Sequence, residues 1–477
     1  MPRTYGHGKR ISIANVSRSA RHACVDRFGY MFPGLARRRR CQLPADQAVR
    51  ADLIALGEEI AAKPGDTDNP NISAGYTYWG QFIDHDITFD PFSDIDAVQN
   101  ANTVQNMRTP SLDLDCVYGR GPGVDPALFD QANPGKMLLG TNTSQGPGGP
   151  NPGETKTDFD VPRNSQGTAI IGDPRNDENL IVSQLQHAFL RFHDAVVDQQ
   201  GTGDFAAARE SVVHHYQWAV VNDFLKTITG RPALVDNTIA NGPRFFRRRP
   251  FRMPVEFAVA AYRFGHSMIR DNYDINQNFI NEPLDQIFRF VRPPLVPVLS
   301  NWVVDFNRFF DTGSGVTVNA SKSIDSNLAV GLNSLPGQVI AKMKRLGGRN
   351  LERSVALGVP TGQCVARRMG IRRLTPAELL QGASPTEAQL LQKSNSRLIK
   401  KTPLWYYILK ESEVKENGER LGRVGARIVV DVFARMLHES STSYIHSGFT
   451  PTLPRHGGAP AGDFTMVDLL SFAGVLS

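Results

Sequence analysis

The sequence predicts a mainly α-helical fold, built as one large domain with long connecting loops and little strand. Three observations lead to this fold class. Apolar residues recur at three- and four-residue steps in several segments, strand signals are few and short, and residues 100–175 are rich in glycine, proline, asparagine and aspartate. No clear linker divides the rest of the chain, so we expect an N-terminal arm over residues 1–70 and a single domain over residues 71–477.

The first predicted helices lie near the N-terminal side. Within an otherwise irregular arm, the stretch ADQAVRADLIALGEEIAA predicts one short helix, and a second helix is expected from Thr77 to Asp86. The glycine- and proline-rich region that follows predicts long loops, which in a compact chain are usually functional or disordered.

Helical periodicity dominates the remainder of the chain. In SQLQHAFLRFHDAVVDQ, Leu185, Phe189 and Phe192 fall on one face, and Asn176 or Asp177 upstream is a candidate N-cap. Pro254 opens another predicted helix, PVEFAVAAYRFGHSMIRD. Further helices are predicted in ESVVHHYQWAVVNDFLKTI, LERSVALGVPTGQCVARRMG, TEAQLLQKSNSRL, TPLWYYILKESEV and GRVGARIVVDVFARMLHE.

Composition narrows the functional classes. The 477 residues carry a net charge of +6, and basic clusters such as ARRRR and FFRRRPFR stand without a recognised nucleic-acid motif. We therefore expect solvated basic faces and no nucleic-acid partner. The four cysteines are scattered, with no CxxC and no CxxCH, which argues against zinc ribbons, iron–sulfur clusters, c-type haem attachment and a disulfide-dense scaffold.

Targeting signals are not recognised in the sequence. The N-terminal stretch has no apolar core typical of a secretory signal, and no apolar run approaches the length of a membrane span. We expect a cytoplasmic protein without a membrane span, with export by a signal-independent route as the alternative.

Charge is placed unusually in the stretch GQFIDHDITFDP. Asp84, His85 and Asp86 stand among large apolar residues, although buried carboxylates need a cation, a metal or a covalent partner. On a helix, Gln81 and His85 share one face, so the segment can present both side chains to a cavity. The alternative is a surface helix of mixed charge, which the neighbouring apolar residues disfavour.

A second constellation is TPSLDLDCVYG. Thr109, Ser111, Asp113 and Asp115 alternate along it, which indicates hard oxygen ligands suited to Ca²⁺, and Asp86 is a candidate for one more carboxylate. The pattern is not an EF-hand, and a solvated turn is the alternative.

Two further motifs precede or lie within predicted helices. In GDPRNDENL, Arg175 and Glu178 are three residues apart. They are either functional groups or part of an ordinary helix N-terminus, where acidic residues are favoured. In AAYRFGHSMI, His266 lies beside Gly265 and three residues after Arg263. Such a histidine is usually a core residue, but the glycine would let a flat ligand approach and the imidazole could ligate a metal.

Taken together, these segments resemble the peroxidase–cyclooxygenase superfamily, the animal-type haem peroxidases. The likeness runs from about Tyr76 to about Gly370, and more weakly to about His438. It rests on the stretch WGQFIDHD, which is close to the family's distal-histidine motif, and on the order of the motifs. The resemblance implies a large single-domain helical haem peroxidase fold, in a diverged member of bacterial type.

The resemblance also implies roles for individual residues. His85 would be the distal base that moves a proton between the oxygens of H₂O₂, and Gln81 would hold a distal water or halide. Arg175 would stabilise negative charge as the O–O bond polarises. His266 would be the axial ligand of the haem iron, and Arg263 would pair with a haem propionate.

Cofactor attachment and calcium binding are implied in the same way. Asp84 and Glu178 match the positions at which the family forms esters to haem b. The implied Ca²⁺ ligands are Asp86, Thr109, Ser111, Asp113 and Asp115.

One region departs from the family pattern. The stretch NLERSVALGVPTGQ places Gln363 where an asparagine usually hydrogen-bonds the proximal imidazole. The family's Arg-Asp-His portion is replaced by Val355, Ala356 and Leu357.

The expected function is a haem-dependent peroxidase that reduces H₂O₂, oxidises a phenol, halide or pseudohalide, and takes part in the response to oxidative stress. One alternative is a fatty-acid dioxygenase of the same superfamily. Cyclooxygenases carry a tyrosine three residues before the proximal histidine, where this chain has Arg263, and Tyr262 is one residue off. A non-catalytic haem- or calcium-binding protein is the other alternative. The sequence leaves the reducing substrate and the oligomeric state open.

Overall fold

Helices form most of the regular structure in this computed structural model, which describes residues 4–5, 10–11, 26–62, 67–90, 96–143, 158–247, 250–293, 295–333, 345–395 and 397–476. The described strands form three two-stranded antiparallel pairs, β1–β2, β3–β6 and β4–β5. The prediction of a mainly α-helical domain with long loops and little strand is confirmed.

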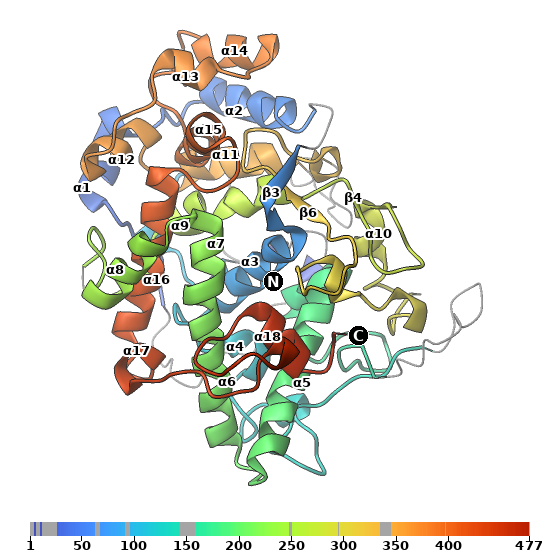
Figure 1. The fold of residues 1–477 in the computed structure, drawn as a ribbon. Helices are drawn as coiled ribbons and strands as arrows, with labels where there is room; N and C mark the ends of the chain where they lie inside the picture. The colour runs from blue at the N-terminus through green and yellow to red at the C-terminus, as the bar shows by residue number, and fades with distance from the viewer. Residues whose placement is uncertain are drawn as a thin grey trace.

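The element bounds follow the chain (Figure 1). The helices are α1 Pro33–Ala36, η2 Arg39–Cys41, α2 Gln47–Glu59, α3 Ala74–Ile87, η3 Ala101–Thr103, α4 Asp115–Tyr118, η4 Pro126–Leu128, η5 Pro174–Asp177, α5 Leu180–Gln200, α6 Phe205–Ala219, η6 Val220–Leu225, α7 Lys226–Thr229, α8 Pro232–Asn241, α9 Val255–Ala258, η7 Ala261–Met268, α10 Leu284–Arg289, η8 Ser300–Trp302, η9 Phe306–Arg308, η10 Val330–Asn333, α11 Leu346–Ala356, α12 Gly362–Met369, α13 Pro376–Leu380, α14 Pro385–Gln392, α15 Leu404–Glu416, α16 Arg423–Glu439, α17 Tyr444–Ser447, η12 His456–Gly458 and α18 Met466–Phe472. The strands are β1 Thr4–Tyr5, β2 Arg10–Ile11, β3 Asp68–Ser73, β4 Asn272–Tyr273, β5 Glu282–Pro283 and β6 Ala320–Lys322.

Helix α3 lies at the centre of the molecule, in contact with α5, η5 and η7 (Figure 1). Its large apolar side chains are fully buried, among them Trp79, Phe82 and Ile83. Phe82 stacks on Phe189 of α5 with ring centroids 4.4 Å apart. Because these contacts fix the rotation of α3 about its axis, they also fix where its polar residues point.

The N-terminal segment packs onto the main body. Helix α2 lies along α11, and the backbones approach so closely that a Cβ on Gly57 would lie 2.1 Å from the amide nitrogen of Gly348. A disulfide between Cys41 and Cys364 joins η2 to α12. The domain boundary at residue 70 stays a prediction.

The predicted helix after Pro254 is interrupted, which corrects the sequence expectation. Helix α9 ends at Ala258, the backbone turns at Ala260, and the following residues form the 3₁₀ helix η7. Two carbonyls are bonded outside a regular α-helical pattern, because Arg263 Nε donates to the oxygen of Ala258 and Trp405 Nε1 donates to the oxygen of Arg263. His266 therefore lies on a short 3₁₀ helix.

The N-cap of α5 is also different from the prediction. Asn179 caps this helix, since its side chain accepts a hydrogen bond from the amide of Val182 at 3.0 Å. Asn176 and Asp177 belong to the preceding η5.

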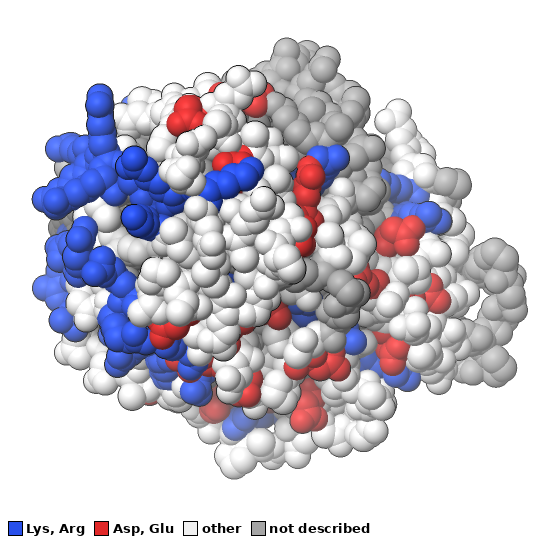
Figure 2. All heavy atoms as spheres, turned by 90° about the horizontal axis from the view of Figure 1, so that it is seen from above, with Lys and Arg blue, Asp and Glu red and all other residues white. Residues whose placement is uncertain are grey.

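Basic side chains gather on one side of the face shown in Figure 2. The described run from Arg37 to Arg40 is exposed throughout, as expected of a solvated basic face. Within the described residues, no helix is both long enough and apolar enough to cross a membrane.

Candidate active site

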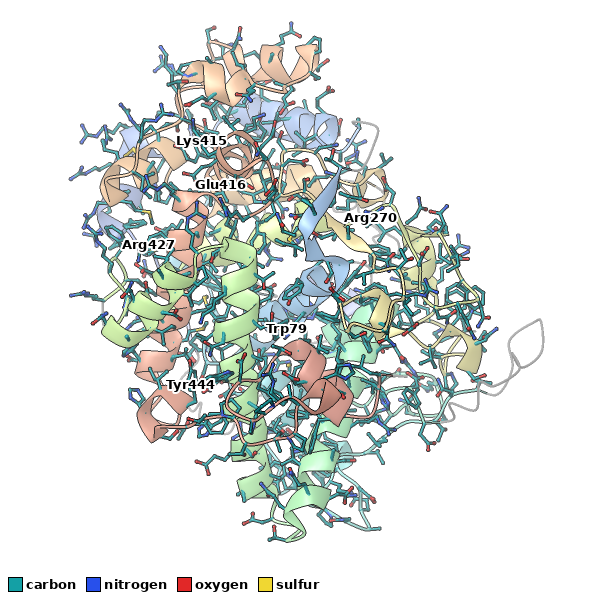
Figure 3. All side chains as sticks on the ribbon, viewed as in Figure 1. Trp79, Arg270, Lys415, Glu416, Arg427 and Tyr444 are labelled. Atoms are coloured by element: carbon teal, nitrogen blue, oxygen red, sulfur yellow. A yellow bond between two sulfur atoms is a disulfide. The ribbon has the colours of Figure 1, made fainter. Side chains whose placement is uncertain are left out.

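A pocket lies between α3 and η7. Helix α3 also carries Trp79, which is labelled near the centre of the molecule in Figure 3. The pocket encloses about 520 Å³, counting its open mouth. The pocket is lined by Tyr76, Thr77, Gly80, Gln81, Asp84, Tyr262, Arg263, Phe264, Gly265, His266 and Met268. The structure therefore brings together Gln81, Asp84, Arg263 and His266 from the predicted site. We call the α3 side distal and the η7 side proximal.

His85 lies one helical turn after Gln81 and is almost fully buried. Its Nδ1 lies 2.7 Å from Oδ1 of Asn176, whose Nδ2 donates to Oε1 of Gln186 at 2.7 Å. Because an amide oxygen only accepts, Nδ1 of His85 carries the proton and Nε2 is left with its lone pair. The sequence offered Asn176 only as a candidate helix N-cap, because its contact with His85 depends on the tertiary fold.

The pKa of His85 is lowered to about 4. Burial is the main cause, since a charged imidazole would lose its hydration, and the positive charge of Arg175 acts in the same direction. The imidazole is therefore neutral at pH 7, which is the state that a proton acceptor needs.

Glu178 connects the two distal side chains. Its Oε1 accepts a hydrogen bond from Nε2 of Gln81 and lies 3.7 Å from Nε2 of His85. Asn179 donates to Oε1 of Gln81 at 3.3 Å, so the turn between η5 and α5 fixes the orientation of the Gln81 amide.

Arg175 lies behind His85, among groups that engage its guanidinium. It forms an ion pair with Asp173 at 2.8 Å, donates to the backbone oxygen of His85 at 2.9 Å and stacks over the ring of Phe89 at 4.3 Å. Burial alone would raise the pKa of Asp173, but Arg108 and Arg175 hold it well below its usual range. The direct role of Arg175 at peroxide stays a prediction, while its charge acts on His85.

The proximal histidine is held by Asn350 of α11, which corrects the assignment of Gln363. The amide nitrogen Nδ2 of Asn350 lies 2.7 Å from Nδ1 of His266. Gln363 instead donates to Thr402 Oγ1 at 2.7 Å and accepts from the Thr402 amide at 3.0 Å, at the start of α12. If the Asn350 amide is turned over, its oxygen accepts from Nδ1–H of His266 and Nε2 is left available to a metal.

Replacing Asn350 and Gln363 by alanine, one at a time, distinguishes their roles. Asn350→Ala is expected to remove the hydrogen bond that orients His266 and to shift the reduction potential of a ligated iron, because the bond raises ligand basicity. Gln363→Ala, the matched control, is expected to leave that potential unchanged. Spectroelectrochemical titration of both variants measures the difference, and equal potentials for Asn350→Ala and wild type would contradict the assignment.

Arg263 lines the proximal side of the pocket, and Arg349 and Arg353 of α11 lie close enough for their charges to repel one another. Arg263 lies 3.5 Å from Asp84 and Arg353 lies 3.4 Å from Asp90. Burial, followed by repulsion from Arg353 and Arg263, lowers the pKa of Arg349 to about 9. An anionic ligand would relieve this repulsion. Arg349 and Arg353 were not singled out in the sequence, although Arg349 comes directly before Asn350 and Arg353 lies three residues after it.

These residues fit a haem. The space around Gly265 is open, because a Cβ there would meet no atom within 4 Å, so a flat group can lie against η7. His266 supplies an imidazole on the proximal side, and the three arginines supply cations for carboxylate groups. Of the two candidate ester positions, Asp84 lines the pocket and Glu178 accepts a hydrogen bond from Gln81, which also lines it.

The predicted calcium ligands are only partly assembled. Asp86 is fully buried, and burial together with the charge of Asp115 raises its pKa to about 7. The Thr109 hydroxyl donates a hydrogen bond to Asp115 at 2.6 Å. Ser111 and Asp113, which lie between them in the sequence, are buried. Within the described part of the chain, no three histidine, cysteine, aspartate or glutamate side chains form a metal-binding group.

Comparisons with known proteins identify the family of this chain. A model of the animal haem peroxidase family matches residues 93–439, more than half of the chain, and begins just after the distal stretch. No curated protein sequence matches the chain significantly.

Solved structures share the fold at low sequence identity. Peroxidase A from Dictyostelium discoideum superposes with a TM-score of 0.64 at 14% identity, covering 98% of this chain and 96% of that one. Fatty acid alpha-dioxygenase from Arabidopsis thaliana gives a TM-score of 0.59 at 14% identity, covering 88% of this chain and 73% of that one. The enzyme of the same name from Oryza sativa gives 0.56 at 14% identity, covering 81% and 72%. The family match and the shared fold confirm the resemblance inferred from the motifs: the chain belongs to the animal haem peroxidase family.

Proposed function

We propose that this protein is a haem b-dependent peroxidase that reduces H₂O₂ and oxidises a small donor such as a phenol, a halide or a pseudohalide. The observation that carries the proposal is the state of His85. Its Nδ1 donates a hydrogen bond to Asn176, its Nε2 carries no proton, and Glu178 lies beside it and accepts a hydrogen bond from Gln81. A non-catalytic haem carrier has no need of a buried imidazole kept neutral in this way.

Each distal side chain has a definable task. Haem, when bound on His266, supplies the iron at which the O–O bond of peroxide is cleaved. His85 Nε2 accepts the proton of the inner peroxide oxygen and returns it to the outer oxygen, which leaves as water. The Gln81 amide, oriented by Asn179 and Glu178, holds a water or halide beside it.

The test is an absorption spectrum of the purified protein before and after peroxide. A Soret band that shifts on addition of H₂O₂, together with oxidation of a phenol, is the expected result. A Soret band without any peroxide turnover would contradict the peroxidase and favour a haem carrier. Mass spectrometry of the denatured protein tests whether Asp84 or Glu178 is esterified to haem after turnover.

A fatty-acid dioxygenase is the second candidate, because Tyr262 lines the same pocket. Its ring stacks on Phe257 with centroids 4.7 Å apart, and its buried hydroxyl has no hydrogen-bond partner within the described residues. Incubation with a fatty acid and O₂ separates the two: oxygen uptake that is lost in Tyr262→Phe would favour the dioxygenase.

The pH dependence of the peroxide reaction follows from the lowered pKa of His85. Since that pKa is about 4, the imidazole stays neutral as pH falls from 7 to about 5, and the rate constant should fall by half only near pH 4. Stopped-flow measurement of the bimolecular rate constant checks this. An inflection near pH 6.5 would show that His85 titrates as an unperturbed histidine.

We also propose that Asp86, Thr109, Ser111, Asp113 and Asp115 bind a structural Ca²⁺. In support, Tyr216 and the amide of Leu114 donate only to Oδ2 of Asp86, each at 3.3 Å, while its buried Oδ1 makes no hydrogen bond within the described residues. A cation would stabilise the charged state of the Asp86 and Asp115 carboxylates, which repel one another.

Calcium removal should therefore destabilise the protein. At a free calcium concentration of a hundred times Kd, binding contributes about 2.7 kcal/mol to the free energy of unfolding. Chelation is expected to lower the Tm of the wild type and of Asp198→Asn, an exposed control, but not that of Asp86→Asn. Metal analysis that finds no calcium would rule the site out.

A further inference from the structure

Tyr76 is a partly exposed phenol at the pocket. It lies on α3 before Gln81 and lines the same pocket as Gln81 and His266. The assignments made above for the distal and proximal side chains give it no task.

The Tyr76 hydroxyl has a fixed acceptor. It donates a hydrogen bond to Oδ1 of Asp223 at 2.5 Å, and the other carboxylate oxygen accepts from the amide of Met466 at 3.0 Å. Asp223 lies on η6, a π-helical turn that continues α6, so three separate parts of the chain hold this pair together. Burial raises the pKa of Asp223, and burial together with the Asp223 charge raises that of Tyr76. The phenol therefore keeps its proton, and the carboxylate is a stronger base than an exposed one.

Tyr262, the other tyrosine of the pocket, differs in this respect. Its hydroxyl is buried and has no hydrogen-bond partner within the described residues. A tyrosine that loses an electron must also release its phenolic proton, so an acceptor at hydrogen-bond distance favours oxidation at Tyr76 over Tyr262.

Aromatic rings extend from Tyr76 into the molecule. Its ring centroid lies 5.6 Å from that of Phe310 and 6.0 Å from that of Trp79, which is fully buried at the centre of the structure (Figure 3). Tyr76, which is itself partly exposed, thus joins a packed aromatic cluster to the lining of the pocket.

We propose that Tyr76 is a second oxidation site, at which phenols too bulky for the pocket are oxidised; the inference rests on the proposed peroxidase function. One electron passes from Tyr76 to the peroxide-oxidised haem, and the phenolic proton moves to Oδ1 of Asp223, which leaves a neutral tyrosyl radical. A bulky phenol at the mouth then gives up a hydrogen atom, which restores the Tyr76 hydroxyl, and Asp223 releases its proton. Two such rounds for each H₂O₂ convert two phenols to phenoxyl radicals and yield two waters.

Radical trapping in the holoenzyme tests the proposal directly. The protein is treated with H₂O₂ and a nitroso spin trap, and the adduct is mapped by peptide mass spectrometry. We expect the adduct on Tyr76 in the wild type and in Tyr78→Phe, a matched control on the same helix whose ring faces Tyr273. Tyr76→Phe should lose it. Asp223→Asn, which keeps the phenol but removes the base, should greatly diminish it.

Turnover gives a second measure. In Tyr76→Phe, the ratio of turnover of a polymer-linked phenol to that of iodide should fall well below the wild-type ratio. An adduct absent from Tyr76 in a wild type whose Soret band still responds to peroxide would overturn this inference and leave the peroxidase function standing. A Soret band unresponsive to peroxide would overturn both. An unchanged ratio in a folded Tyr76→Phe, or an undiminished adduct in Asp223→Asn, would also overturn it.

Discussion

His85→Ala is expected to retain haem and to react with H₂O₂ about 10²- to 10⁴-fold more slowly than the wild type, the range that a positioned acid–base group contributes. Haem retention follows because His85 lies on the distal side, whereas His266 and the arginines of the proximal side would hold the cofactor. The measurement is the bimolecular rate constant for the peroxide-induced Soret change, taken by stopped flow.

His187→Ala is the matched control for this variant. His187 is also almost fully buried, on α5, but its ring packs on that of Phe159 with centroids 5.5 Å apart. We expect its rate constant to equal that of the wild type. A wild-type rate in His85→Ala would remove the distal base from the proposal, and the source of proton transfer would have to be sought at Glu178.

His266→Ala should have the second large effect, loss of the axial ligand. The variant is expected to bind haem weakly or to show an altered Soret band and electron paramagnetic resonance spectrum, because no other imidazole lines the pocket within the described residues. Added imidazole should restore part of the spectrum by occupying the space that the side chain leaves. Spectra identical to those of the wild type would show that the iron is ligated elsewhere.

The helix that carries Gln81 and His85 could be predicted from the sequence, because its pattern of apolar residues is local. Gln81 and His85 are four residues apart on a helix whose apolar residues specify the buried face, and this pattern survives folding. The element itself was placed to within a few residues, from the predicted Thr77–Asp86 to the observed Ala74–Ile87.

The proximal side was harder, for a physical reason. The hydrogen bond to His266 comes from Asn350 of α11, 84 positions further along the chain. Only the tertiary fold brings these two residues together. Gln363 fits a linear motif, but the turn between α11 and α12 directs its side chain to Thr402. The break of the helix at Ala260 also depends on tertiary contacts that the sequence pattern does not show. Trp405 of α15 donates a hydrogen bond to the backbone oxygen of Arg263, although the periodicity of PVEFAVAAYRFGHSM predicts a continuous helix.

The Cys41–Cys364 pair has a consequence for where the folded chain can persist. Its two cysteines lie 323 positions apart, so in the chain-entropy account the crosslink restricts the unfolded ensemble by on the order of 5 kcal/mol. Crosslinks of this sort endure in oxidising surroundings and are opened by the thiol buffers of the cytosol. The chain should therefore melt at a lower temperature after treatment with dithiothreitol than before it.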